Sequence, residues 1–206
     1  MIGHSVLVLV DVQNVFYGSK NYTKGKSQVD YGKLIDKIQS EVHDIIAGTY
    51  SNDFYLASIV QPVLTTYGYV VQSPKYNGIG LFALLRKLDY KLRFKIFPDG
   101  LDPEAYWKGS VGALMQMDYI DWCPNYDTVV VVSGSGIFEP VFKASKHNWP
   151  RVRRVICAFD NTLHKAYTER DDLVEHIIRL DESVLRTFGR DRGERNEETR
   201  GDATSG

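Results

Sequence analysis

Short, unbroken apolar runs constrain the fold of this chain more than any other feature of its sequence. The first run, SVLVLV, covers Ser5–Val10, and a second, DTVVVV, covers Asp127–Val132. A strand with one solvated face alternates apolar and polar residues, whereas a strand buried on both faces is apolar along its length. The two runs therefore predict central strands of a parallel sheet that other elements cover on both faces.

Helical patterns separate these runs from further predicted strands. Tyr31–Ile46, for example, repeats its apolar residues at the spacing of an amphipathic helix. Because strands and helices alternate, we predict an α/β fold, a three-layer sandwich with a mainly parallel central sheet. The predicted strands are Ser5–Val10, Tyr67–Gln72, Lys91–Phe97, Asp127–Val132, Arg153–Phe159 and His176–Leu180, and the predicted helices are Tyr31–Ile46, Gly78–Leu88, Trp107–Ile120, Ile137–Lys146 and His164–Val174.

The segments between these elements are less regular. Gly18–Gly32 is polar and rich in Lys, Ser, Asn and Gly, so we predict a loop there and a second one at Pro98–Tyr106. Phe54–Val63 reads as a strand or as a short helix broken before its proline. The run KLRFKIF at Lys91–Phe97 alternates basic and apolar residues, which is typical of an outer strand with one solvated, basic face.

The length of 206 residues suits one domain, which we place at residues 1–185. Beyond it, residues 186–206 mix both charges without apolar periodicity, so this segment is predicted to be a disordered tail. Cys123 and Cys157 lack metal-ligand spacing and are expected to be small buried residues in a reducing compartment. No run approaches the ~20 apolar residues of a membrane-spanning helix, so we expect a cytoplasmic protein without a membrane partner.

Polar residues follow the two central runs at their carboxyl ends. Asp11 and Asn14 come after the first run, and the turn SGSG at Ser133–Gly136 comes after the second. In open α/β sheets, ligands bind outside the carboxyl ends of the strands, and a glycine turn before a helix can present N–H groups to a phosphate. The same residues also occur where they only cap a turn, so the sequence alone leaves both interpretations open.

Other reaction classes fit the sequence less well. A phosphotransferase of the haloacid dehalogenase type needs Asp-x-Asp after the first strand, and here the second position is Gln13. A nucleophile elbow needs Gly two residues before its serine, and Ser135 has Ser133 there. The sequence also lacks the glycine patterns of the P-loop and of dinucleotide-binding folds.

The net charge of −1 predicts no general attraction to nucleic acid, so any binding needs a local patch. One candidate patch surrounds Trp149 and His147, where basic side chains can contact phosphates while the aromatic ring stacks on a base. A solvated helix end followed by an exposed turn is the alternative interpretation. The basic residues of this stretch are Lys143, Lys146, Arg151, Arg153 and Arg154.

Three blocks, in this order, resemble the NYN domain of the PIN-like nuclease fold, a family that includes the LabA-like proteins. They are DVQN after the first strand, KGSVGALMQMD on a helix, and SGSGIFEP after an apolar strand, within a resemblance that spans residues 5–180. The resemblance implies a four- or five-stranded parallel sheet with carboxylates that hold Mg²⁺ or Mn²⁺, and it implies cleavage of single-stranded or structured RNA by active members. Hard divalent cations need oxygen ligands, and such a metal activates water and stabilises charge on the phosphate.

The resemblance also implies roles for individual residues. Asp11 matches the first aspartate of the family, Asn14 its asparagine, and Asp118 the later aspartate of the middle block, so these three are the predicted catalytic residues. Asp11 and Asp118 are also the predicted metal ligands. The residues predicted to contact phosphate or RNA are Lys108, Ser133, Gly134, Ser135 and Gly136.

The chain departs from the family pattern where acids are usual. An aspartate is often found at the position of Gly112, and the last block, usually SGDGDF, reads SGSGIF here, with Ser135 and Ile137 in place of its two acids. Isoleucine cannot bind a metal. Two carboxylates with waters can still hold one Mg²⁺ or Mn²⁺ weakly, but a two-metal site is not expected.

We therefore predict an RNA-directed protein, either a weak metal-dependent ribonuclease or, by preference, a catalytically degenerate RNA binder. Loss of acidic residues also reduces repulsion of an RNA backbone, which favours binding over cleavage. The alternative is a protein-interaction or regulatory module of LabA-like type without nucleic-acid chemistry.

Overall fold

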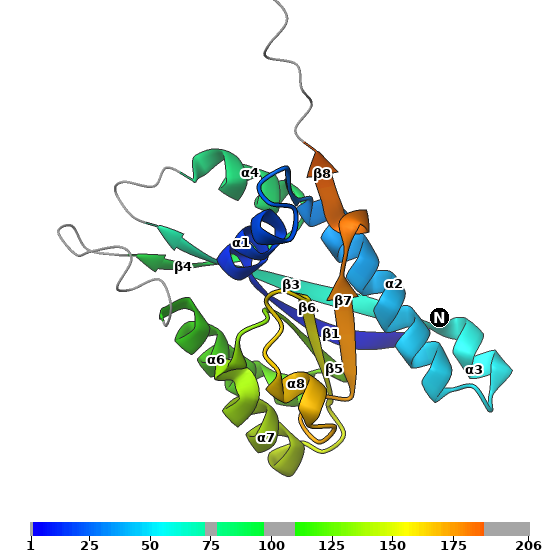
Figure 1. Cartoon of the computed structure of the whole chain (residues 1–206). Helices are drawn as coiled ribbons and strands as arrows, with labels where there is room; N and C mark the ends of the chain where they lie inside the picture. Colours follow the sequence, from blue (N-terminus) through cyan, green and yellow to red (C-terminus); the bar gives the residue numbers. More distant parts are fainter. Residues whose placement is uncertain (1, 73–77, 97–109, 188–206) are drawn as a thin grey trace, which may run out of the picture.

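The central sheet of the computed structural model has the strand order β4-β3-β1-β5-β6-β7, and every neighbouring pair is parallel (Figure 1). The structure describes residues 2–72, 78–96 and 110–187. The sheet strands are β1 (Ile2–Asp11), β3 (Val60–Gln72), β4 (Lys91–Ile96), β5 (Thr128–Val132), β6 (Arg153–Phe159) and β7 (His176–Leu180). The helices are α1 (Val12–Tyr22), α2 (Tyr31–Thr49), α3 (Phe54–Ile59), α4 (Ile79–Lys87), α6 (Ser110–Trp122), α7 (Glu139–Asn148) and α8 (Ala166–Glu169), with 3₁₀ turns η1 (Cys123–Asn125), η2 (Gly136–Phe138) and η3 (Glu182–Val184).

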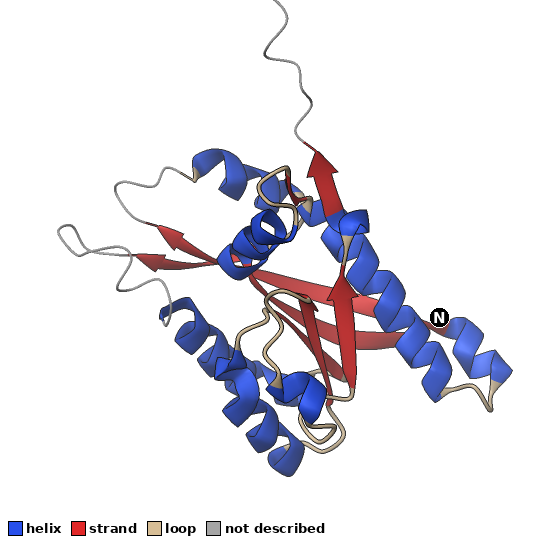
Figure 2. Cartoon of the chain, viewed as in Figure 1, coloured by secondary structure: helices blue, strands red, loops and turns tan. Residues whose placement is uncertain are grey.

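Strand β1 is central because its side chains are apolar on both faces. Val6, Val8 and Val10 point to one face and Leu7 and Leu9 to the other, and all five are fully buried. The first set packs with α1, α2 and α4, and the second with α6, α7 and α8. The result is the predicted three-layer α/β sandwich, with helices on both faces of the sheet (Figure 2).

The order in which strands are added to the sheet changes side at β1. From this strand the chain proceeds outward to β3 and β4, and it then returns to the other side of β1 to add β5, β6 and β7. The carboxyl ends of β1 and β5 therefore lie side by side, with crossovers that leave in opposite directions. Such a switch point opens a crevice at the edge of the sheet.

Most predicted strands and helices are present, and the structure differs from the predictions at four points. The predicted loop Gly18–Gly32 is wrong over most of its length, because α1 extends to Tyr22, a short strand covers Ser27–Val29 and α2 begins at Tyr31. The predicted helix His164–Val174 is reduced to the four-residue α8. The sheet has six strands rather than the four or five implied by the resemblance, and the helix predicted from Ile137 begins as the 3₁₀ turn η2.

Phe54–Val63, predicted as a strand or a short helix, contains both a helix and the start of a strand. Its first part is α3, and β3 then begins at Val60 and contains Pro62. Strand β4 pairs with β3 only from Tyr67 onward, so in the described part of the sheet Pro62 lies where β3 pairs with β1 alone. Proline is tolerated there because its missing N–H is not needed by a second neighbour. Strand β4 is at the edge of the sheet, as its alternating pattern predicts.

A second, two-stranded sheet pairs β2 (Ser27–Val29) with β8 (Leu185–Thr187). Strand β8 extends two residues beyond the domain boundary predicted at residue 185, and residues 188–206 lie outside the described part of the chain. Cys123 and Cys157 are buried and free, as expected for both. Among the described residues, no helix combines the length and apolar character that crossing a membrane requires.

Candidate functional site

The switch point brings the ends of β1 and β5 into a hydrogen-bonded network. The Asp11 carboxylate accepts the backbone N–H of Asn14 at 3.0 Å and so caps α1, and it faces the Ser133 hydroxyl at 3.4 Å. The Asn14 side-chain oxygen accepts the backbone N–H of Gly134 at 3.0 Å. Two residues predicted from the sequence, Asp11 and Asn14, thus fix the start of α1 against the turn that follows β5.

A pocket of about 510 Å³ lies beside this network. Asp11 and Asn14 line it together with Ser135 and Ile137, so the structure brings these four residues of the first and last blocks to one place. Its remaining walls come from α1, from the start of α6 and from the loop after β6. The other lining residues are Gln13, Tyr17, Gly18, Asn21, Val111, Gly112 and Thr162.

Helix α1 supplies a wall of the pocket that the sequence analysis missed. Gln13, Tyr17 and Asn21 are four residues apart and therefore lie along one side of the helix, where they line the pocket. The opposite side, with Val12 and Val15, is buried in the core. The helical spacing of these polar and aromatic residues was the available signal, but the small and polar residues that follow concealed it.

The turn after β5 is held tightly by its neighbours. A Cβ atom built on Gly134 would lie 2.1 Å from the Thr162 carbonyl oxygen, so only glycine permits this approach of the loop after β6. The His164 N–H donates to the Gly134 carbonyl at 2.8 Å, and the Tyr167 hydroxyl donates to the Ser135 carbonyl at 2.7 Å. The turn is therefore a rigid wall of the pocket.

The amides of this turn are already used inside the protein. The N–H of Gly134 donates to Asn14, that of Ser135 faces the Ser133 hydroxyl at 3.4 Å, and that of Ile137 faces the Ser135 hydroxyl at 3.5 Å. A phosphate cradle needs N–H groups that point at the ligand. These three amides already have partners inside the protein, and contacts of the turn Ser133–Gly136 with phosphate stay a prediction.

Two departures from the family pattern contact each other in the pocket wall. A Cβ atom on Gly112 would lie 2.0 Å from the Cδ1 atom of Ile137, so the isoleucine side chain fills the space that any side chain at position 112 would need. The Gln116 amide donates to the Ile137 carbonyl and holds η2 against α6. Two of the three positions at which acids are usual in the family are thus occupied by a complementary glycine and isoleucine.

The structure does not bring Asp118 to the pocket. Its carboxylate is buried on α6 and accepts two hydrogen bonds from Arg93, with Nε···Oδ2 at 2.9 Å and Nη2···Oδ1 at 3.0 Å. The Tyr69 hydroxyl donates to Oδ2 at 2.8 Å. Hydrogen bonding to Asp118 raises the pKa of Arg93, so the guanidinium remains charged. Both oxygens of Asp118 are therefore committed to a neutralising partner on β4.

The contacts of Asp118 with Arg93 and Tyr69 determine whether the pocket can bind a metal ion. Asp11 is the one carboxylate among the described residues that line the pocket, and within residues 2–72, 78–96 and 110–187 no three acidic, histidine or cysteine side chains are grouped as metal ligands. A binding site for Mg²⁺ needs several hard oxygen ligands. The expected pair of Asp11 and Asp118 does not form one, because the second carboxylate is held by Arg93.

The environment of Asp11 also disfavours a cation ligand. Burial raises the pKa of its carboxyl group, and hydrogen bonds from the Asn14 N–H and the Ser133 hydroxyl offset only part of this increase. Without a counter-charge, burial favours the neutral form of a carboxyl group. Asp11 therefore connects the start of α1 to the turn after β5, and its carboxyl oxygens are not presented to a cation.

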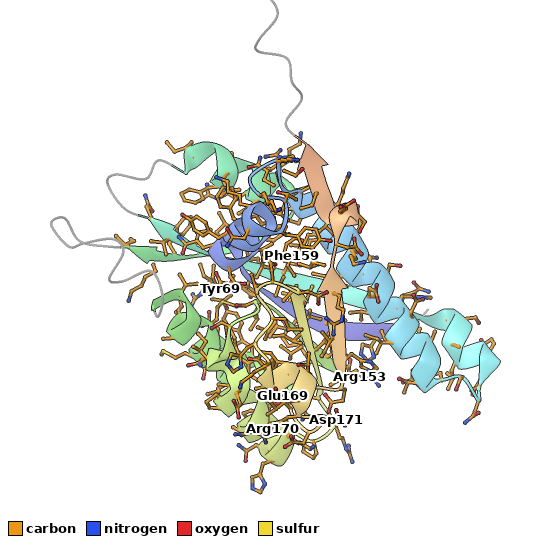
Figure 3. All side chains as sticks on the ribbon, in the orientation of Figure 1. Tyr69, Arg153, Phe159, Glu169, Arg170 and Asp171 are labelled. Carbon is orange, nitrogen blue, oxygen red and sulfur yellow. The ribbon has the colours of Figure 1, made fainter. Side chains whose placement is uncertain are left out.

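The other predicted contacts with RNA are distributed differently. Lys108 lies outside the described residues. In the basic stretch Arg154 is buried and paired with Glu175, and Arg153 donates to Thr49 at 2.7 Å. These arginines belong to the amino end of β6, whereas the pocket lies at the carboxyl ends of the strands. Figure 3 shows Arg153 well apart from Tyr69, the partner of Asp118. No residue of the basic stretch is among the described residues that line the pocket.

Comparisons with known proteins address the family and the fold. A family model described as the NYN domain matches residues 5–175. A crystal structure of a protein of unknown function from Vibrio parahaemolyticus resembles this chain with a TM-score of 0.65 and 18% sequence identity, and the match covers 89% of this chain and 96% of the other. At this identity the likeness concerns the fold alone. The search of curated proteins gave no match.

Proposed function

Because the chain belongs to the NYN-domain family, a nuclease-like and RNA-related family, we propose that it binds RNA and has lost metal-dependent cleavage. The observation that carries this proposal is the pairing of Asp118 with Arg93 and Tyr69. This pairing occupies the second carboxylate that the family pattern offers to a cation, and Asp11 is then the one carboxylate among the described residues that line the pocket. No cleavage step can be built on this set of ligands.

Binding of RNA near the pocket is supported by the charge of α1 and of the turn that follows it. Between Asp11 and Asp30 the sequence contains Lys20, Lys24 and Lys26 and no acidic residue. The lysines on and directly after α1 attract a polyanion such as RNA locally, although the net charge of the chain is −1. Asn14, Asn21 and Ser135 add polar groups for base edges or sugar hydroxyls.

Titration with Mn²⁺ tests the loss of the metal. We expect the wild type to give no binding heat in calorimetry at millimolar Mn²⁺. The double substitution Ser135→Asp and Ile137→Asp adds two hard ligands beside Asp11 and should create a measurable site. Ile137 is partly buried and packs against the core, so the folding of both double variants is checked first by circular dichroism. The matched control is Ser135→Asn with Ile137→Asn, which has the same size but no charge.

Binding and cleavage of RNA are measured with the same proteins. We expect wild-type binding to a labelled single-stranded RNA to be equal with Mn²⁺ and with EDTA, and the RNA to remain intact. A wild-type protein that binds Mn²⁺, loses it on Asp11→Asn and cleaves RNA would refute the proposal.

A protein-interaction role is the second candidate, and one observation favours it. Helix α6 exposes Met117 and Ile120, which are 64% and 43% accessible and lie one turn apart on its outer face. Exposed apolar side chains next to each other are typical of contact sites, although single ones are common on any protein. Substitution of both by Gln should leave RNA binding unchanged, and loss of RNA binding in this variant would connect α6 to the RNA site.

A further inference from the structure

A second hollow of about 280 Å³ lies on the other side of α1. It is lined by apolar and aromatic side chains of α1, β3 and α4, and one basic side chain is among them. Phe16 also lines a third hollow, which continues between α1 and α4 toward Arg186 of β8. The residues that line the second hollow are Val12, Gln13, Phe16, Tyr17, Lys20, Val70, Val71, Leu81 and Phe82.

The second hollow adjoins the pocket at the switch point. Gln13 and Tyr17 line both, so these two side chains form the ridge between them. Tyr17 is 49% exposed, and its ring meets that of Phe16 edge to face, with the ring centres 5.4 Å apart. A ligand that extends from the pocket can therefore cross this ridge without leaving the surface of α1.

The charges of α1 and α4, two helices that line the second hollow, favour an anionic ligand, and the aromatic lining favours one with flat apolar parts. The sequences of α1 and α4 contain no acidic residue, while α1 contributes Lys20 and α4 contributes Arg86 and Lys87. The Lys20 ammonium lies 4.6 Å from the centre of the Phe16 ring. A nucleobase that stacks on this ring takes the place of the ammonium, which then contacts the neighbouring phosphate.

We propose that the second hollow is a base-stacking subsite for an unpaired nucleobase of the RNA strand that occupies the pocket at the switch point. This inference rests on the proposed function and adds the class of RNA. In a duplex the faces of the bases are covered by their neighbours, so aromatic side chains reach only single strands, loops and ends. The site therefore selects single-stranded RNA, with one base at Phe16 and Tyr17 and its phosphate near Lys20.

The first test compares variants that remove the aromatic face or the charge and keep the fold. Phe16→Leu retains an apolar side chain, and Phe16 lines the second hollow but not the first. We expect it to weaken binding of a short single-stranded RNA about tenfold, measured by fluorescence anisotropy, since stacking on one base contributes on that scale. Lys20→Gln should weaken binding and also lower the salt dependence by about one counterion.

A spectroscopic measurement reports stacking directly. A single-stranded RNA that carries 2-aminopurine in place of one adenine should lose emission on binding to the wild type, because stacking quenches this base. The quenching should be smaller with Phe16→Leu at saturating protein. Equal quenching in both proteins would show that no base stacks on this ring.

A matched control lies at the other end of the molecule. Tyr55 of α3 is 71% exposed, and Tyr55→Leu removes an aromatic face there. This substitution should not change binding. If Phe16→Leu and Tyr55→Leu bind alike, or if a duplex of the same sequence binds as tightly as the single strand, the subsite is refuted.

The failure of the subsite is distinguishable from failure of the proposed function. Asn21→Asp places a negative charge in the first pocket and should weaken binding of RNA there. If Asn21→Asp weakens binding and Phe16→Leu does not, RNA binds at the switch point and the second hollow does not take part. A wild type that binds no RNA of either kind refutes both.

Discussion

Two aspartates that match the same family pattern have different roles in this chain, because their neighbours differ. Asp11 ends β1 and holds the start of α1 and the turn after β5 through neutral donors. Asp118 sits between a guanidinium and a phenol and has a counter-charge. A residue that matches a metal ligand in sequence is therefore a ligand only if its partners leave its oxygens free.

The raised pKa of Asp11 makes a prediction about stability and pH. A carboxyl group with a raised pKa in the folded protein favours folding when it is protonated. Its contribution is greatest below the unfolded value of about 3.9 and is lost as the pH rises through the folded value. Asp11→Asn should therefore melt a few degrees above the wild type at pH 7, and the difference should disappear as the pH falls toward 4.

Thermal unfolding followed by circular dichroism over this pH range measures the effect. The control Asp36→Asn, at an exposed position of α2, corrects for the loss of one negative charge. If Asp11→Asn melts below the wild type at pH 7, the carboxylate of Asp11 stabilises the fold and our assignment of its environment is wrong.

Individual site residues could be predicted from the sequence where a strand end positions them. Asp11, Asn14, Ser135 and Ile137 follow two strands that are recognisable from their apolar runs, and the structure places all four around one pocket. The pairing of Asp118 could not be predicted, because its partners Arg93 and Tyr69 come from strands distant in sequence. Patterns along the chain do not report such contacts across elements.

At the scale of elements, the glycine of α6 and the isoleucine of η2 behave as one unit. In the wild type, Gly112→Ala places a Cβ atom 2.0 Å from Ile137 Cδ1, so the side chain must move. In an Ile137→Val background that atom is absent and the nearest remaining atom, Cγ1, lies 3.4 Å away. We expect Gly112→Ala to cost about 1 kcal/mol more in the wild type than in the Ile137→Val background.

Urea unfolding of the four proteins of this cycle measures the coupling. Gly80→Ala on α4, where a Cβ atom meets nothing within 4 Å, is the control and should show no coupling to Ile137→Val. Equal costs of Gly112→Ala in both backgrounds would show that Ile137 does not fill this space in solution.

The elements themselves were predictable to different degrees. Strands β6 and β7 have the predicted bounds, because each is a short apolar run between polar turns. Helix α1 was missed because its buried side includes Gly18 and Ser19, which carry no apolar signal although they pack in the core. Ser19 is buried since its hydroxyl bonds the Phe16 carbonyl and accepts the Val29 N–H. Small residues buried for close packing and hydrogen bonding are not visible in a hydrophobic pattern.

At the scale of the whole molecule, β8 connects the end of the described chain to its beginning. Val184 and Leu185 are buried, and the Asp30 N–H donates to the Val184 carbonyl at 2.8 Å. A chain that ends at Ser183 loses these contacts and the pairing with β2, and it should melt roughly ten degrees lower. A chain that ends at Phe188 should melt within a few degrees of the full chain, because few apolar residues follow.

Differential scanning calorimetry of the two shortened chains and the full chain provides the comparison. A large decrease for the chain that ends at Phe188 would mean that the predicted tail packs on the domain. No decrease for the chain that ends at Ser183 would mean that the small sheet contributes nothing to stability.

The central place of β1 has a consequence for the synthesis of the protein. Ser5 and Asp127 are hydrogen-bonded partners although 122 positions separate them, and β1 pairs with β5 only through such distant contacts. During translation β1 is synthesised before β3 and β5. We expect β1 to pair with β3 first, and the edge of β1 that pairs with β5 then stays unpaired for seconds until β5 is translated. Unpaired edges of this kind recruit other chains. Slowed translation between β3 and β5 should therefore increase aggregation and dependence on chaperones, whereas slowing it after β6 should not.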